Sequence, residues 1–365
     1  MLKQVTLDDI QPIALGAGIL GTGGGGNPYL GALHLRETIK QYGAVQVVDP
    51  SDLPDDARVP LTGYIGAPTA SIEKMEEGTE LVQSIRALEK HLGVSMDAVG
   101  IAEIGGSNSM SPMVAALQAG IPVVDGDSMG RAFPELQMST FLFNGGAVVT
   151  PLALVDAGGN TVVIPRTASA VWAERLARNL ATSMGATAGL AGTIVTGAQV
   201  KSSGVHYTLS LAHHIGRRVL AAQDAGEDVP EAVAAMLDGR ILLRGKITDV
   251  HRRTVRGFAR GTLMIEGYGK TPDHLYIEFQ NEFLIAYLNG EIVATVPDLI
   301  TIVTDDTGEP ISTEILRYGL RVAVIALPGA AALKTQRGLE VVGPRAFGYD
   351  VDFAPLPGGV IGEKP

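Results

Sequence analysis

Acidic side chains spaced for chemistry follow a short apolar run near the middle of the chain. Asp125 and Asp127 come directly after this run, which has the pattern of a buried strand, so both carboxylates should project from the same side of its end. Arg131 and Glu135 follow four and eight residues after Asp127. Closely spaced carboxylates shift one another's pKa and can supply the base and the acid that activate water. A solvated turn before a helix-capping glutamate is the structural alternative.

The roles within this segment stay open at the level of sequence. Asp125 and Asp127 offer hard oxygen ligands for Mg²⁺ or Mn²⁺, and a histidine such as His206 would favour Zn²⁺. Without a metal, the carboxylates themselves would act on water. Arg131 would either anchor a substrate carboxylate or hold Asp127 or Glu135 in place. We therefore predict catalytic roles for Asp125, Asp127, Arg131 and Glu135, and a divalent metal held by Asp125, Asp127 and His206 as one option.

A run of glycines near the N-terminus is the second candidate. Residues 21–26 read Gly-Thr-Gly-Gly-Gly-Gly, and Asn27 followed by Pro28 is a typical start of a helix. A glycine loop at a helix N-terminus exposes backbone N–H groups to a carboxylate, a phosphate or a developing oxyanion, and a Cβ would block the close approach. The loop therefore predicts substrate-binding residues at Gly23, Gly24, Gly25 and Gly26.

The same region contains a formal dinucleotide-binding pattern. Gly16, Gly18 and Gly21 match G-x-G-x-x-G, and Asp49 provides an acid after a later strand. The pattern requires a strand directly before the glycines, whereas residues 8–12 contain two aspartates and a proline. Dinucleotide binding is therefore the less favoured interpretation.

Strands and helices alternate over the first part of the chain, which predicts an α/β layer with a mostly parallel sheet. Residues 98–104 read as one of these strands, and Glu103, Ser107 and Asn108 lie at its end. The carboxyl ends of parallel strands meet at one edge of a sheet, so these side chains should converge with the Asp125 segment. We predict Glu103 as a catalytic residue and Ser107 and Asn108 as substrate-binding residues.

The pattern changes in the second half of the chain. We place a domain boundary near residue 166, with an α/β domain over 1–166 that carries the glycine loop and the acidic cluster. Residues 167–365 begin with helical segments, and from about residue 240 apolar and polar residues alternate between turns. This alternation is typical of an antiparallel sheet, so the second domain should be α+β and rich in antiparallel β structure. Asn281 and Glu282 lie beside these strands and are candidate substrate-binding residues.

Composition limits the functional classes. The chain has 365 residues, a net charge of −11 and no cysteine. A cysteine nucleophile and a thiolate metal site are therefore excluded. The acidic balance argues against nucleic acid as a partner, and no apolar run reaches the roughly 20 residues that span a bilayer. We expect a cytoplasmic protein that binds a small molecule and forms a homo-oligomer or a complex with a partner.

Several segments together resemble one bacterial family. The glycine run with Asn27-Pro28, the Glu-Ile-Gly-Gly-Ser-Asn stretch at 103–108, the stretch at 124–138 and Asn281-Glu282 resemble the family catalogued as domain of unknown function 917 and described as S-methyl thiohydantoin desulfurase-like. The resemblance implies an α/β N-terminal domain, a β-rich C-terminal domain and hydrolytic removal of sulfur from a thiohydantoin-like ring. Members of this family are often encoded near hydantoinase/oxoprolinase proteins.

The favoured hypothesis is a hydrolase of a five-membered cyclic amide or thioamide, probed by replacing Asp125 or Asp127. The alternatives are a non-catalytic subunit or partner of a hydantoinase/oxoprolinase-type complex and, less favoured, a dinucleotide-binding enzyme.

Overall fold

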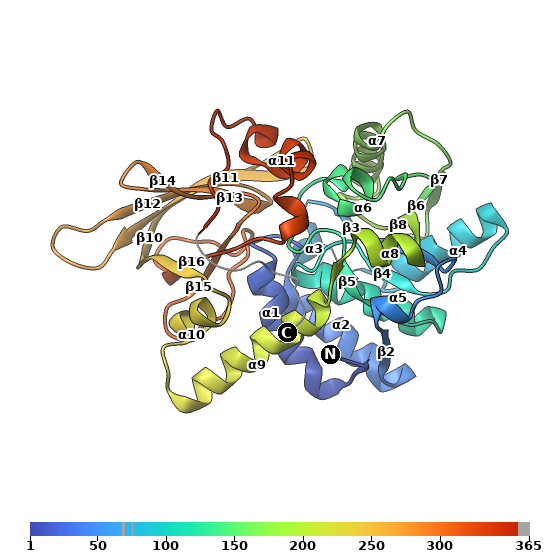
Figure 1. The fold of residues 1–365 in the computed structure, drawn as a ribbon, viewed down its shortest axis with the longest axis horizontal. Helices are drawn as coiled ribbons and strands as arrows, with labels where there is room; N and C mark the ends of the chain where they lie inside the picture. Colours follow the sequence, from blue (N-terminus) through green and yellow to red (C-terminus); the bar gives the residue numbers. More distant parts are fainter. Residues whose placement is uncertain (68–69, 75, 357–365) are drawn as a thin grey trace.

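Two β-sheets with helices between and around them form the part of the chain that the computed structural model describes, residues 1–67, 70–74 and 76–356 (Figure 1). Both predicted fold classes are confirmed: the first sheet is α/β in character, and the second is antiparallel. No helix within these ranges combines the length and the apolar character that a membrane-spanning segment needs.

The first sheet has a parallel centre. β2 (Val45–Val48), β5 (Val123–Asp127), β4 (Val99–Ile101) and β3 (Arg58–Gly66) lie side by side in that order, and neighbours are parallel. The carboxyl ends of β3, β4 and β5 therefore meet at one edge. Antiparallel strands extend this centre, and among them β8 pairs with β3, so the sheet includes residues beyond 166; these strands are β1 (Gln4–Val5), β6 (Leu152–Val155), β7 (Thr161–Ile164), β8 (Thr187–Thr196) and β9 (Val205–His206).

Helices cover the first sheet. α4 (Glu80–Leu92) packs on β6 and β8 through buried Leu81, Ile85 and Leu88, which recur at the spacing of one helix face. It ends at Gly93, whose left-handed φ of 69° suits a residue without a Cβ. The other helices around this sheet are α2 (Pro28–Tyr42), α3 (Ala70–Glu73), α5 (Ser111–Ala119), α6 (Thr140–Phe143), α7 (Ala170–Ser183) and α8 (Gly197–Ser203), with short 3-10 helices η1 (Leu7–Asp9), η2 (Pro50–Asp52), η3 (Gly106–Ser109) and η4 (Leu136–Met138).

The second sheet is antiparallel throughout. Its long first strand pairs with its neighbour to form a hairpin whose turn is at Arg256 and Gly257. In chain order its strands are β10 (Arg240–Val255), β11 (Phe258–Gly267), β12 (His274–Gln280), β13 (Glu282–Leu288), β14 (Glu291–Thr295), β15 (Leu299–Thr304) and β16 (Arg321–Leu327), followed by η5 (Ala331–Leu333), α11 (Gln336–Val342) and η6 (Pro344–Phe347).

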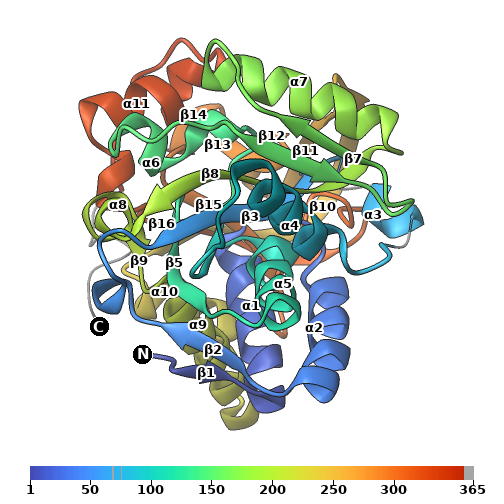
Figure 2. The same ribbon diagram turned by 90° about the vertical axis from the view of Figure 1, so that its right-hand side faces the viewer.

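A helical layer lies between the two sheets (Figures 1 and 2). α1 (Ile10–Leu20) packs along α9 (Thr208–Ala225) and against β15, and α10 (Val229–Met236) packs on β10 and β16. One continuous apolar core includes side chains from all these elements. The two sheets are therefore joined through shared helices.

The close packing of α1 on α9 explains the first glycine of the dinucleotide-like pattern. Gly16 and Gly18 lie inside α1 instead of in a loop after a strand. A Cβ on Gly16 would come 1.8 Å from the backbone oxygen of Ala212 in α9, so this glycine permits helix packing. Residues 7–15, directly before these glycines, are helical, whereas a dinucleotide site requires a strand there.

Candidate active site

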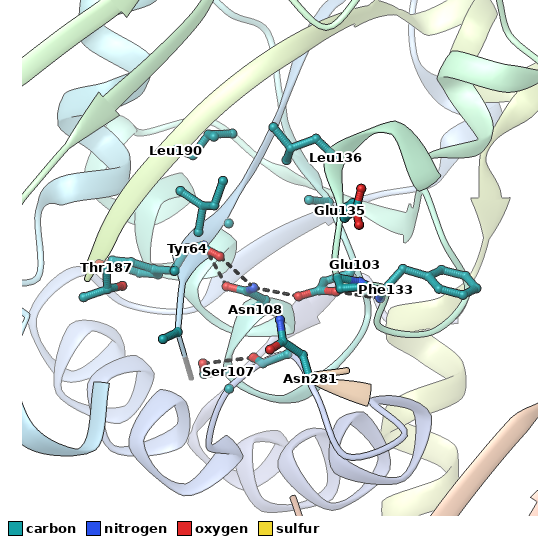
Figure 3. A pocket seen from close by; sticks show the side chains of 18 of the residues that line it. Tyr64, Glu103, Ser107, Asn108, Phe133, Glu135, Leu136, Thr187, Leu190 and Asn281 are labelled. Carbon is teal, nitrogen blue, oxygen red and sulfur yellow. Dashed lines mark hydrogen bonds between the residues drawn. The ribbon is translucent and has the colours of Figure 1, made fainter. Parts of the chain in front are cut away.

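A cavity of about 110 Å³ lies at the carboxyl ends of β3 and β4, where turns of the second sheet meet the first. The glycine loop, the segment after β4 and the segment after β5 supply three of its walls. Figure 3 shows Ser107 and Asn281 on one side of the cavity and the apolar Leu136 and Leu190 on the other. Polar groups thus face an apolar wall across a space suited to a small ring.

Glu103 lies in this cavity in a fixed orientation. Its side chain follows β4 and is 8% exposed. Oε1 accepts a hydrogen bond from the Asn108 amide at 2.7 Å, and Oε2 accepts one from the Phe133 backbone N–H at 3.1 Å. Burial raises the pKa of Glu103 to about 7, although both hydrogen bonds oppose that rise. A carboxyl that titrates near neutral pH is suited to act as a general base.

Asn108 holds Glu103 in place. Its side chain accepts a hydrogen bond from the Tyr64 N–H at 2.8 Å and donates to the Tyr64 carbonyl oxygen at 3.2 Å, so it is tied to the backbone of β3 (Figure 3). The remaining N–H of its amide goes to Glu103. Both N–H groups of the Asn108 side-chain amide are therefore occupied. This geometry favours a role in orienting Glu103 over direct binding of substrate.

Glu282 brings a second carboxyl into the cavity from the other sheet. It starts β13, directly after Asn281, which turns the chain with a φ of 60°. Glu282 is 2% exposed, and its Oε2 has no hydrogen-bond partner among the described residues. Burial raises the pKa of Glu282 well above its ordinary value, and the negative charge of Glu103 raises it further. Burial and the neighbouring charge thus both favour the protonated form of Glu282, whereas the nearby Arg131 and Arg178 oppose them.

Asn281 is fixed by two hydrogen bonds to the backbone of Ala259. Its side-chain oxygen accepts a hydrogen bond from the Ala259 N–H at 2.8 Å, and its own N–H donates to the Ala259 carbonyl at 2.7 Å. The amide nitrogen of the side chain points toward the Glu103–Asn108 pair (Figure 3). Asn281 is thus placed to donate a hydrogen bond to a molecule in the cavity.

The predicted glycine loop splits into two parts. Gly25 and Gly26 line the cavity, have φ values of 77° and 81°, and their backbone N–H groups have no acceptor among the described residues. Such amides can bind a carbonyl oxygen or an oxyanion. Gly23 and Gly24 lie behind them, against the second sheet, where a Cβ on Gly24 would be 2.0 Å from Oε1 of Glu282. Asn27 caps α2 as predicted, accepting the Tyr29 N–H at 2.9 Å.

The two other predicted residues that line the cavity are Ser107 and Glu135. Ser107 donates a hydrogen bond from Oγ to the Gly25 carbonyl at 3.2 Å, so it also supports the glycine loop. Glu135 lines the cavity, half-buried, and its Oε2 accepts a hydrogen bond from Gln137. The structure therefore brings together Glu103, Ser107, Asn108, Gly25, Gly26, Glu135, Asn281 and Glu282.

Asp125 and Asp127 lie outside this cavity. Asp125 accepts hydrogen bonds from the N–H and the hydroxyl of Ser210, at 3.0 and 2.5 Å, and so fixes the start of α9 on β5. Asp127 accepts backbone N–H groups of Ile104, Met129 and Gly130 at 2.9 to 3.1 Å. Asp127 borders a void of about 10 Å³, which is space for about one water molecule. These contacts indicate that both carboxylates shape the turn after β5.

Arg131 is fully buried and joins the two sheets. Its guanidinium donates to the carbonyl oxygens of Asp298 at 2.7 Å and Phe283 at 3.1 Å and to Oγ1 of Thr22 at 2.7 Å. No part of it faces the cavity. The prediction that Arg131 anchors a substrate carboxylate is therefore not supported by its contacts, because its donors are used within the protein.

The predicted metal ligands do not assemble. His206 is hydrogen-bonded to the Val200 carbonyl at 2.8 Å, and the oxygens of Asp127 face N–H groups, which repel a cation. Within the described ranges, no three His, Asp or Glu side chains are arranged to hold a metal ion. These contacts do not fit a metal site at Asp125, Asp127 and His206.

Three titratable residues of the cavity were not predicted from the sequence. Tyr64 and Glu76 line the cavity, and burial raises the pKa of Glu76 to about 7. Arg178, from α7, also lines it and forms an ion pair with Glu174. A signal for Arg178 existed in the sequence, because Ala173, Ala177 and Ala181 mark a buried stripe of α7 to which Glu174 and Arg178 belong.

The fold and the cavity define a two-sheet protein with an enclosed pair of carboxyl groups contributed by both halves of the chain. Family models match nearly all of it: the S-Me-THD-like N-terminal domain over residues 8–166 and the S-Me-THD-like C-terminal domain over 168–356. The chain therefore belongs to the S-Me-THD-like family, named for S-methyl thiohydantoin desulfurase.

A solved structure shows the same fold. The crystal structure of a protein from Chromobacterium violaceum is similar over 96% of this chain and 99% of that one, with a TM-score of 0.81 and 26% sequence identity. No curated protein matches the chain.

Proposed function

We propose that the chain is a hydrolase that replaces the methylthio group of a five-membered S-methyl thiohydantoin ring with oxygen from water. Membership of the S-Me-THD-like family supports a thiohydantoin-related role. The observation that carries the proposal is the pair formed by Glu103 and Glu282: two buried carboxyl groups in one small cavity, with an oxygen of Glu282 left without a partner among the described residues. Carboxyls whose pKa values are driven apart can serve as base and acid.

The first half of the reaction uses both acids. Ring C2, bonded to two nitrogens and one sulfur, is the electrophile. Glu103 in its ionised form takes a proton from a water molecule whose oxygen attacks C2, and Glu282 gives its proton to the ring nitrogen. The amides of Gly25 and Gly26 and the side chain of Asn281 are available to hold the ring's carbonyl oxygen.

The second half restores the acids. The new hydroxyl on C2 returns a proton to Glu282 as the C2–S bond breaks, and Glu103 gives its proton to the leaving methanethiolate. The products are the hydantoin ring with a C2 carbonyl and methanethiol, and the ring stays closed. Each carboxyl ends in the state in which it began, so the cycle balances without a further reactant.

Thiol release tests this proposal directly. The purified protein is incubated with S-methyl thiohydantoin, and free thiol is followed with a thiol-reactive dye; the chain has no cysteine, so it contributes no background. Incubation in ¹⁸O-labelled water should place the label on C2 of the product. Absence of thiol release above a protein-free control, or a ring product without the label, would contradict the proposal.

A further inference from the structure

Arg178 contacts backbone segments that lead to both carboxyl groups of the cavity. Its side chain is 8% exposed, and its Nε donates to Glu174 one turn earlier in α7. Nη2 donates to the Pro134 carbonyl at 2.8 Å, and Nη1 donates to the Gly257 carbonyl at 3.3 Å and more weakly to the Gly66 carbonyl at 3.4 Å. One guanidinium therefore joins the end of β3, the segment after β5 and the β10–β11 turn.

The contact with Pro134 leads to Glu103. Phe133, directly before Pro134, donates its backbone N–H to Oε2 of Glu103 at 3.1 Å. A guanidinium that holds the Pro134 carbonyl limits movement of this segment, because its planar set of donors fixes several acceptors at once. The position of one donor to Glu103 thus depends on Arg178.

The contact with Gly257 leads to Glu282. The β10–β11 turn lies against Arg178 so closely that a Cβ on Gly257 would be 2.9 Å from the Arg178 Cγ, and the guanidinium lies 4.1 Å from the Phe258 ring centre. The next residue, Ala259, is paired with Asn281 through two hydrogen bonds, and Asn281 precedes Glu282. The same arginine therefore supports the segment that places the second carboxyl.

We propose that Arg178 is a positioning residue that sets the placement of Glu103 relative to Glu282 across the junction of the two sheets. This inference rests on the proposed function for its kinetic consequence, but the placement itself can be measured without turnover. Arg178 acts through Phe133–Pro134 and through Gly257–Ala259, without forming a hydrogen bond to either carboxyl.

Arg178→Met, Arg178→Lys and Gly257→Ala separate placement from charge. Arg175→Met is the matched control, because Arg175 is exposed on the same helix and outside the cavity. For Arg178→Met we expect kcat to fall about 100-fold, the loss typical of a displacement near 1 Å, with a smaller change in KM. In the pH profile of kcat/KM for this variant, the low-pH limb should move to higher pH, because a cation that favours ionised Glu103 is lost.

The other two variants should split these effects. Arg178→Lys keeps the positive charge but cannot hold the same set of carbonyls, so the pH limb should stay near that of the unmodified protein while kcat remains low. Gly257→Ala should lower kcat through a displaced turn without moving the limb. If Arg178→Met matched Arg175→Met in kcat and in the pH limb, the inference would be wrong; a loss of thermal stability alone would also overturn it.

Two readouts need no catalysis. Hydrogen exchange at the Ala259 and Asn281 amides should quicken in Arg178→Met and stay unchanged in Arg175→Met, and the NMR titration midpoint of the Glu103 carboxyl should rise. Should the unmodified protein release no thiol, the proposed function fails while these two readouts still decide the role of Arg178. Unchanged exchange together with an unchanged midpoint would overturn the inference by itself.

Discussion

Two pairs of buried acids, Asp125 with Asp127 and Glu103 with Glu282 from the second sheet, lie near the carboxyl edge of the first sheet and differ in what their oxygens contact. Asp125 and Asp127 are surrounded by donors from the turn after β5 and the start of α9. Glu103 and Glu282 line a cavity, and Glu282 has a free oxygen among the described residues. Burial raises the pKa of both Glu103 and Asp127 to about 7. A perturbed pKa therefore does not separate a catalytic acid from a structural one, whereas the contacts do.

Isosteric amides should reveal the largest difference between the pairs. Glu103→Gln and Glu282→Gln each remove a proton-transfer group, so we expect kcat for thiol release to fall about 10³-fold, within the usual range for general acid–base catalysis. Asp127→Asn should retain kcat within a few-fold in its folded fraction. Steady-state kinetics on all three variants, with folding checked by circular dichroism, make the comparison. Equal losses in the two pairs would remove the distinction.

The free energy of unfolding should show the reverse order, with Asp127 contributing more than Glu282. Asp127→Ala leaves backbone N–H groups of Ile104, Met129 and Gly130 without their acceptor in a buried turn. We expect the free energy of unfolding to fall by about 3 kcal/mol, since each unsatisfied buried donor is costly. Glu282→Gln should change it much less, because Oε2 has no partner to lose among the described residues. Urea denaturation of both variants measures this; a smaller loss for Asp127→Ala than for Glu282→Gln would contradict it.

A change behind the cavity tests whether Glu282 must stay where it is. Gly24 has an ordinary φ, so alanine there adds only a Cβ, which would lie 2.0 Å from Oε1 of Glu282. We expect kcat to fall about 10-fold or more as the carboxyl is displaced, in keeping with the sensitivity of catalysis to small shifts. Gly158→Ala is the control, because Gly158 lies on an exposed turn outside the cavity and its Cβ would come no closer than 3.3 Å to the nearest side chains. Comparable kinetics in the two variants would argue against a role for Glu282.

The pH dependence should give the smallest effect. Because the pKa of Glu103 is about 7 when folded and about 4.5 ordinarily, the folded state holds the proton more tightly. Its contribution to stability is present below pH 4.5 and is lost as pH rises through about 7. Glu103→Gln should thus reduce the drop in urea midpoint between pH 5 and pH 7.5. In the same interval kcat/KM should rise as the base ionises; a rate that falls with pH would contradict this role.

Local patterns in the sequence predicted much of the fold. The Asn27-Pro28 start of α2 and the alternation from residue 240 both depend on neighbours in the chain, and both are confirmed. The pairing of β8 with β3 joins segments more than 100 residues apart, and it carries no local pattern.

The candidate site was predictable only in part, for a similar reason. Glu103, Asn108, Asn281 and Glu282 stood out as polar residues at strand ends, and the cavity includes them. Asp125 has the same local pattern, but its partner Ser210 lies 85 residues away. Arg178, in α7, contacts Gly257 in a turn of the second sheet, and only the assembled fold brings these two residues together.

The most direct test of the acid pair is a crystal structure of Glu103→Gln with S-methyl thiohydantoin bound. We expect the ring inside the cavity, with C2 about 3 to 3.5 Å from a water molecule held by the side chain at position 103, a ring nitrogen beside Glu282, and the ring carbonyl against the Gly25 and Gly26 amides. A ring bound next to Asp125 and Asp127, or outside the cavity altogether, would contradict it.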